Sequence, residues 1–195
     1  MNAMPVVGGA AAAGPAPREQ KQYLTFMLGA EMYAFGILRV KEIIGYGSLT
    51  AVPMMPQCIR GVINLRGAVV PVMDLAARFG QPARDVGKRT CIVIVEVEPE
   101  AEADAGADAA AGAERQVIGV VVDAVNAVLD IDAAQIAPPP AFGARIRSDF
   151  IEGMGKVNGA FVILLDARKV LSAAEIGALS AAGAPAAAAP GLTET

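Results

Sequence analysis

The sequence predicts a mostly-β protein in which two small SH3-like β-barrels of five strands each lie side by side. Short apolar runs separated by Gly, Pro or Asn are typical of strands joined by tight turns. A hairpin followed by a short helix also occurs twice along the chain. A flat five-stranded sheet would leave both edges exposed, and closing each sheet into a barrel removes them.

An internal repeat organises the chain. Residues 61–76 and 153–168 align without a gap, because the same offset of 92 residues relates all the matching positions. Each copy predicts a strand, a tight turn and a second strand, since Arg66-Gly67 and Asn158-Gly159 suit the positive φ of hairpin turns. An aspartate then stands at the predicted N-cap of a short helix. The matching pairs are Gly61 and Gly153, Gly67 and Gly159, Ala68 and Ala160, and Asp74 and Asp166.

Each half of the chain is expected to contain about five short strands. We place barrel one at about residues 22–90 and barrel two at about residues 91–171. Short helices are expected at residues 74–79, 148–152 and 167–179. Before the repeated unit, strands are expected at residues 23–28, 32–37 and 40–44 in the first half and at 91–97, 117–122 and 125–129 in the second.

Three segments are expected to lie outside the folded domain of residues 22–179. Residues 1–21 and 180–195 are rich in Ala, Gly and Pro and are predicted to be disordered tails. Residues 98–113 form an acidic insert without large apolar side chains, within a stretch from Glu96 to Glu114 that holds seven acids and no base. These segments bury too little apolar surface to offset their ordering entropy.

The composition argues against an enzyme or a metal protein. The chain has no histidine, which removes the commonest general base and the commonest metal ligand. We therefore expect no catalytic residues, no metal and no cofactor. The two cysteines, Cys58 and Cys91, are expected to be free thiols in a reducing compartment, and a disulfide is the alternative.

Neither a membrane-spanning segment nor a nucleic-acid-binding surface is indicated. The mean hydropathy is +0.47, but the longest apolar stretch, residues 116–129, is interrupted by Asp123 and Asn126. Residues 1–17 lack the basic start of a signal peptide, so a cytoplasmic location is expected. Small barrels can bind single-stranded nucleic acid, but the chain is only 5% aromatic, has no tryptophan and shows no basic stripe.

Three motifs, in the same order along the chain, resemble the CheW family of chemotaxis coupling proteins. The resemblance covers residues 22–179 in register, apart from the acidic insert, which is longer than a simple hairpin turn. The tails are also longer and richer in alanine than is usual in the family. The motifs are Val40-Lys41-Glu42-Ile43, the stretch Gly61-Val62-Ile63-Asn64-Leu65-Arg66-Gly67, and residues 119–125.

The resemblance implies a paired-barrel adaptor without catalytic activity. Such a protein would link the cytoplasmic tips of methyl-accepting chemoreceptors to the regulatory domain of a CheA-like histidine kinase. It would be recruited to receptor arrays at the inner face of the membrane without inserting into it. An adaptor of a non-flagellar pathway, such as surface motility, is the alternative, because the sequence marks no particular pathway.

The motifs also suggest partner-binding residues. Val40 matches a family position implicated in partner contact, and ordinary strand packing is the competing explanation. Glu42 lies two residues further on and is expected on the same face of the strand. Arg66, with Asn64 in the same motif, is expected to reach a partner's carboxylate or backbone. The competing explanation is that Arg66 packs over its own barrel and hydrogen-bonds the hairpin. Gly61 is expected to serve backbone geometry and close approach of the partner.

The groove between the two barrels is a second expected binding surface, because domain junctions form concave surfaces. Family analogy places the receptor's helical hairpin there. In the family register Cys91 and Val125 would line this groove, and core packing is the competing explanation for both.

Overall fold

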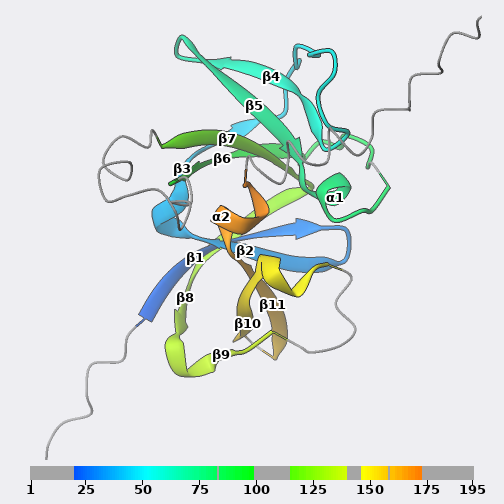
Figure 1. Ribbon diagram of the computed structural model, residues 1–195. Helices are drawn as coiled ribbons and strands as arrows, with labels where there is room; N and C mark the ends of the chain where they lie inside the picture. Colours follow the sequence, from blue (N-terminus) through cyan, green and yellow to red (C-terminus); the bar gives the residue numbers. More distant parts are fainter. Residues whose placement is uncertain (1–19, 83, 99–114, 140–145, 158, 173–195) are drawn as a thin grey trace, which may run out of the picture.

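The computed structural model describes residues 20–82, 84–98, 115–139, 146–157 and 159–172 of the 195-residue chain. Residues 99–113 of the predicted acidic insert lie outside this part of the chain. So do the predicted tails, apart from residues 20–21. Those two residues belong to the first strand, so the folded region begins earlier than predicted. Figure 1 shows two β-units, one above the other.

The lower unit in Figure 1 is a six-stranded sheet with the strand order β8-β1-β2-β11-β10-β9. A short 3-10 helix, η2 (Ala133–Gln135), connects β8 directly to β9. The two ends of the strand order are therefore joined by the chain itself, which curls the sheet into a barrel. The strands are β1 (Gln20–Leu28), β2 (Glu31–Gly36), β8 (Ala124–Asp132), β9 (Ile136–Ala137), β10 (Ile151–Val157) and β11 (Ala160–Leu165).

The upper unit is a five-stranded sheet with the order β3-β6-β7-β5-β4. Thr50, in the segment that follows β3, exchanges two backbone hydrogen bonds with Val62 of β4, at 3.0 and 2.9 Å. This bridge draws the two edges of the sheet together. The strands are β3 (Val40–Gly45), β4 (Ile59–Leu65), β5 (Ala68–Asp74), β6 (Cys91–Val97) and β7 (Gln116–Val122).

The two barrels are not the two consecutive halves of the chain, so the predicted boundary near residue 90 is wrong. The hairpin β1-β2 pairs with β8 and β11 from the second half, and the hairpin β6-β7 pairs with β3 and β5 from the first half. The halves therefore exchange their first hairpins. The six-stranded sheet also contains a sixth, two-residue strand, β9, that pairs with β10.

The repeated hairpins and their helix caps are confirmed. β4 pairs with β5 and β10 pairs with β11, each followed by a one-turn helix, α1 (Leu75–Arg78) or α2 (Ala167–Val170). The Asp74 carboxylate accepts a hydrogen bond from the Ala77 N–H at 3.1 Å, and Asp166 accepts one from the Arg168 N–H at 3.0 Å. Both aspartates thus have the predicted capping role.

Two predicted helices differ from the structure. Instead of a helix over residues 148–152, a 3-10 turn, η3 (Ser148–Phe150), leads directly into β10. The turn ends there because Ile151 has extended dihedral angles and pairs with Leu165. Of the helix predicted over residues 167–179, the structure describes only α2, which ends at Val170, and residues 173–179 lie outside the described part of the chain.

The largest apolar core lies between the barrels and makes them one packed unit. Strand β6 shows why, because its apolar run CIVIV is buried on both faces. Val93 and Val95 point into the central core, while Ile92 and Ile94 fill the interior of the five-stranded barrel. Phe26 and Phe35 contribute from the other sheet, with ring centroids 5.3 Å apart. This burial fixes the relative positions of the two barrels.

Candidate partner-binding site

The motif Asn64-Leu65-Arg66-Gly67 forms a tight turn at the tip of the β4-β5 hairpin. Arg66 and Gly67 both have positive φ, 53° and 91°, as the two central residues of a type I′ turn require. The Asn64 side-chain oxygen accepts a hydrogen bond from the Gly67 N–H at 2.9 Å. Asn64 therefore holds the turn in shape, and this turn orients the Arg66 side chain.

Arg66 forms an ion pair with Glu42 across the opening of the barrel. The guanidinium donates a hydrogen bond to the Glu42 carboxylate at 3.0 Å. The Arg66 side chain is 81% exposed and the Glu42 side chain 26% exposed. The sequence motifs suggested both residues as partner-binding residues but did not predict that they contact each other. Because most of the guanidinium faces solvent, Arg66 retains donors for a partner.

Val40 and Glu42 do not share a face of β3, which corrects the prediction. A β-bulge lies between them, because Val40 pairs with Val95 but Glu42 pairs with the preceding residue, Ile94. A bulge adds one residue to a strand and reverses the alternation of its side chains beyond that point. Val40 consequently packs against the central core, and Glu42 lies on the other face, which carries the Arg66 contact.

Cys91 and Val125 come together at the junction of the barrels, although they belong to different sheets. Both side chains pack against the central core, and the backbone of Val125 hydrogen-bonds the Cys91 sulfur. Burial raises the pKa of the Cys91 thiol, and the bond from Val125 offsets this effect only in part. Burial likewise raises the pKa of Cys58. Both thiols are therefore protonated at neutral pH and poorly nucleophilic.

Gly61 is required by the backbone of β4. Its φ is 148°, and a Cβ built on it would lie 2.5 Å from the Thr50 carbonyl oxygen. The bridge between Thr50 and Val62 passes directly over this glycine. Gly61 therefore permits the close approach that closes the barrel, which is a structural role.

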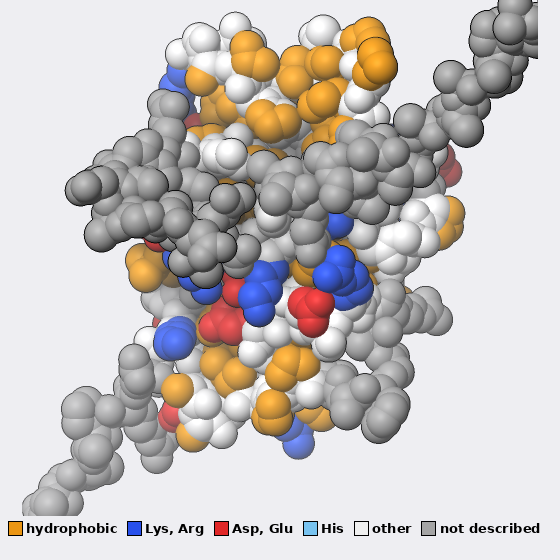
Figure 2. Space-filling view, viewed as in Figure 1, with side chains coloured by type: hydrophobic (Ala, Val, Ile, Leu, Met, Phe, Trp, Pro, Cys, Tyr) orange, Lys and Arg blue, Asp and Glu red, His pale blue; other side chains and the backbone are white. Residues whose placement is uncertain are grey.

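Sequence reasoning missed a set of exposed apolar side chains on the five-stranded unit. Val69 lies beside the turn, whereas residues 52–55 follow the Thr50–Val62 bridge toward the other end of β4. Val69 pairs with Asn64 and is 71% exposed, and Met54 is 98% exposed. Figure 2 shows hydrophobic side chains gathered at this end of the molecule, over β4 and β5. The placement of Met54-Met55 between Pro53 and Pro56 could have revealed them, because large apolar residues flanked by prolines cannot join a central strand. We call Val52, Met54, Met55 and Val69 the apolar tip.

The described residues contain no group suited to metal binding and no long membrane helix. Among them, no cluster of three or more His, Cys, Asp or Glu side chains could hold a metal ion. Within the same residues, none of the helices is long and apolar enough to cross a membrane. The site that remains combines exposed apolar side chains with the projecting Arg66, which suits contact with another protein.

Residues 22–175 match the family model described as the CheW-like domain. The chain belongs to the CheW family. It is 33% identical over 156 residues to the chemotaxis protein CheW of Klebsiella aerogenes, an alignment that covers 80% of this chain and 84% of that protein. It is also 28% identical over 159 residues to the protein FrzA of Myxococcus xanthus, with 80% and 89% of the two chains covered.

A solved CheW structure has the same fold. The scaffolding protein TtCheW from Thermoanaerobacter tengcongensis superimposes with a TM-score of 0.65 and 34% sequence identity, covering 78% of this chain and 92% of that chain. The CheW resemblance and the mostly-β, paired-barrel fold expected from the sequence are thereby confirmed. Among the residues that the structure describes, the candidate site consists of the Asn64 turn, the Glu42–Arg66 pair and the apolar tip, of which Val69 adjoins the turn.

Proposed function

We propose that this CheW-family chain is a non-catalytic adaptor that couples chemoreceptors to a CheA-type histidine kinase in chemotaxis. The observation that carries the proposal is the projecting Arg66, held by Glu42 and Asn64 beside the exposed Val69. Relatives named chemotaxis protein CheW, and the scaffolding protein of similar fold, support the same function.

The kinase regulatory domain is the partner proposed for the apolar tip. Interface cores combine apolar anchors with a few charged groups that fix the register, and arginine is enriched among the residues that dominate binding. Val69 supplies exposed apolar area, and Arg66 supplies a charged group next to it. Met54 adds exposed apolar area toward the other end of β4. The hydrogen bond between Asn64 and Gly67 fixes the shape of the turn before binding, which lowers the ordering entropy that opposes binding.

The receptor tip is the partner proposed for the junction near Cys91 and Val125. This position belongs to both sheets, so a receptor bound there would contact both barrels at once. The two surfaces lie on separate parts of the molecule, which allows both partners to bind together. In this arrangement the chain reaches the inner face of the membrane through the receptor.

Calorimetric titration with the cognate kinase regulatory domain tests the proposal. We expect a dissociation constant in the micromolar range, since binding of about −7 to −8 kcal/mol suits a moderate interface. The variant Val69→Ser should weaken the interaction, because it removes apolar area from the tip. Lys88→Ser, at an exposed position in the loop before β6, serves as the control. Absence of heat with about 100 μM of each partner would refute kinase binding.

A further inference from the structure

Met54 is the most exposed methionine that the structure describes. It is 98% exposed, whereas Met55 is 41% exposed and Met73 is 0% exposed. Met32 and Met154 are partly buried and pack against apolar cores. Met54 therefore presents its thioether sulfur to solvent, where a peroxide can oxidise it to the sulfoxide.

The backbone of the segment before β4 displays Met54 outward. The φ of Met54 is 62°, in a region that residues other than glycine rarely adopt. Before it, a bridge joins Thr50 to Val62. After it, the Ile59 N–H donates a hydrogen bond to the Pro56 carbonyl at 2.8 Å. A long apolar side chain that is exposed in an unfavourable backbone conformation adds nothing to the core, and such outliers indicate a role outside the fold.

The two cysteines compete poorly for an oxidant. Peroxides react with the thiolate, which requires an accessible cysteine of low pKa. Cys58 is only 5% exposed, and Cys91 is partly buried against the central core. Burial raises the pKa of both thiols. Within the described part of the chain, the Met54 thioether is therefore the most accessible sulfur.

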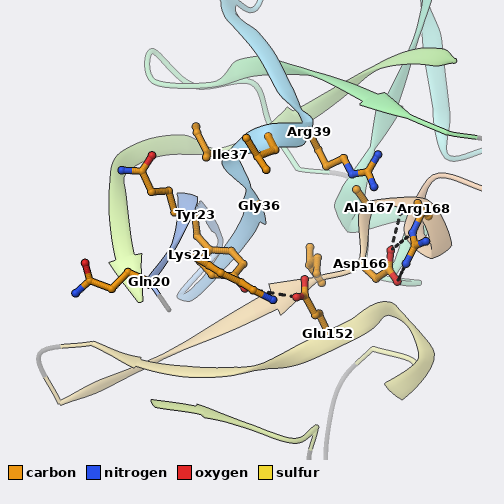
Figure 3. A pocket seen from close by; sticks show the side chains of 13 residues that line it. Gln20, Lys21, Tyr23, Gly36, Ile37, Arg39, Glu152, Asp166, Ala167 and Arg168 are labelled. Carbon is orange, nitrogen blue, oxygen red and sulfur yellow. Dashed lines mark hydrogen bonds and ion pairs between the residues drawn. The ribbon is translucent and has the colours of Figure 1, made fainter. Parts of the chain in front are cut away.

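The cleft beside α2 offers no comparable group. This cleft of about 780 Å³ opens where the start of β1, the 3-10 helix η1 (Ile37–Arg39) and α2 meet (Figure 3). Two of its cations are already paired, Arg39 with Glu98 and Arg168 with Asp166. None of the described residues that line it contains sulfur. Peroxide chemistry is therefore expected in the segment before β4 and not in this cleft.

We infer that Met54 is a modification site at which hydrogen peroxide forms a sulfoxide and makes the apolar tip more polar. The sulfur gains one oxygen atom and loses two electrons, the O–O bond of the peroxide breaks, and the second oxygen leaves as water. Methionine sulfoxide reductases reverse the step. In that reversal two thiols supply the electrons, form a disulfide and release water.

Oxidation of Met54 also has a consequence for binding, which rests on the proposed function. An apolar side chain at an interface is useful because its burial removes apolar surface from water. A sulfoxide at the same position carries a polar oxygen that is costly to bury without a hydrogen-bond donor. The oxidised chain is therefore expected to bind the kinase regulatory domain more weakly than the reduced chain.

Peptide mapping of the full chain after limited treatment with hydrogen peroxide tests the modification. Trypsin releases residues 42–60 as one peptide, which contains Met54, Met55 and Cys58. Tandem mass spectrometry then assigns the added oxygen to one of three sulfurs in the same peptide. Among the described methionines, we expect the sulfoxide at Met54 first and at Met73 last. Oxidation of Cys58 or Met73 as fast as that of Met54 would overturn the inference.

Hydrophobic interaction chromatography tests whether the oxidation changes the apolar tip. The oxidised parent should elute earlier than the reduced parent, because a polar sulfoxide replaces an exposed apolar group. Met54→Leu should lose this shift, since leucine is apolar and has no sulfur, and the matched control Met55→Leu should retain it. An equal shift in Met54→Leu would locate the change elsewhere and overturn the inference. A circular dichroism melt of each variant checks that it is folded.

Calorimetry with the kinase regulatory domain tests the consequence for binding. The oxidised parent should bind about tenfold more weakly, or by about 1.4 kcal/mol. Met54→Gln, which places a polar group there without peroxide, should be weakened similarly, and methionine sulfoxide reductases with dithiothreitol should restore the oxidised parent. Unchanged affinity of the oxidised parent would overturn this consequence. If the untreated chain does not bind, the proposed function fails, whereas the mapping and the chromatography still decide the modification site.

Discussion

The Glu42 carboxylate and the Arg66 guanidinium lie 3.0 Å apart and join β3, at one edge of the five-stranded sheet, to the turn beside the other edge. The contact stabilises the fold little, because exposed ion pairs contribute at most about 1 kcal/mol. Its main consequence is the orientation of Arg66 at the surface proposed to bind the kinase.

Reversal of the charge of Arg66 should abolish kinase binding and leave the fold intact. In Arg66→Glu, two carboxylates face each other at the turn, and the partner loses its guanidinium contact. We expect at least about a tenfold loss of affinity by calorimetry, with a thermal midpoint within a few degrees of the parent. The double variant Glu42→Arg with Arg66→Glu restores the ion pair in reversed orientation and should also melt like the parent. If Arg66→Glu binds as tightly as the parent, Arg66 is not part of the interface.

Val40→Asp should destabilise the fold, in contrast to Arg66→Glu. Val40 packs against the central core, so an aspartate there places a charge against apolar side chains. We expect a loss of about 2–3 kcal/mol in the free energy of unfolding, measured by urea denaturation. Leu38→Asp, at a position that is 95% exposed, should change the stability by less than about 0.5 kcal/mol. If Val40→Asp is as stable as the parent, Val40 does not contribute to the core. It would then again be a candidate for the partner-binding surface.

The two repeats provide a matched test of the helix caps. Asp74 caps α1 and also accepts a hydrogen bond from the Arg60 guanidinium at 2.8 Å, and its side chain is 5% exposed. Asp166 occupies the equivalent position, but its ion pair with Arg168 is more exposed. Asp74→Ala should cost about 3 kcal/mol, because it removes a cap and leaves Arg60 without its carboxylate partner. Asp166→Ala should cost about 1 kcal/mol. Equal losses in urea denaturation would contradict this account of Asp74.

Tyr23 should lose its proton at a higher pH than an ordinary tyrosine. Its pKa is raised from 10.0 to about 12, first by burial and then by the neighbouring Glu152 carboxylate. The folded state thus favours the neutral phenol, so this contribution to stability is complete below about pH 10 and is lost as the pH rises toward 12. Absorbance at the tyrosinate band should show a late transition that Tyr23→Phe removes. Normal titration of all three tyrosines before unfolding would contradict the assignment.

Local sequence signals predicted the hairpins and caps, but not how the strands combine into barrels. The turns at Gly67 and Gly159 and the caps at Asp74 and Asp166 depend on neighbouring residues only, so the repeat reveals them. The exchange of hairpins depends on the parallel pairing of β2 with β11 and of β5 with β7, which joins distant segments. The apolar patterns of these strands suit either barrel, so the sequence does not distinguish the two arrangements.

The candidate site was predicted in part. The motif identified Asn64 and Arg66, and the structure places them at one turn. The bulge that separates Val40 from Glu42 could not be predicted, because the stretch Val40-Lys41-Glu42 also suits a regular strand. The contact between Cys91 and Val125 depends on packing of the two sheets, which the family register suggested and the residues alone did not.

The central claim is that one molecule of this chain connects a kinase to a receptor. Sedimentation of receptor-containing membranes with the kinase, in the presence and absence of the chain, tests this directly. We predict that the kinase sediments with the membranes when the chain is present and stays in the supernatant when it is absent or replaced by Arg66→Glu. Kinase sedimentation that is the same with and without the chain would contradict the claim.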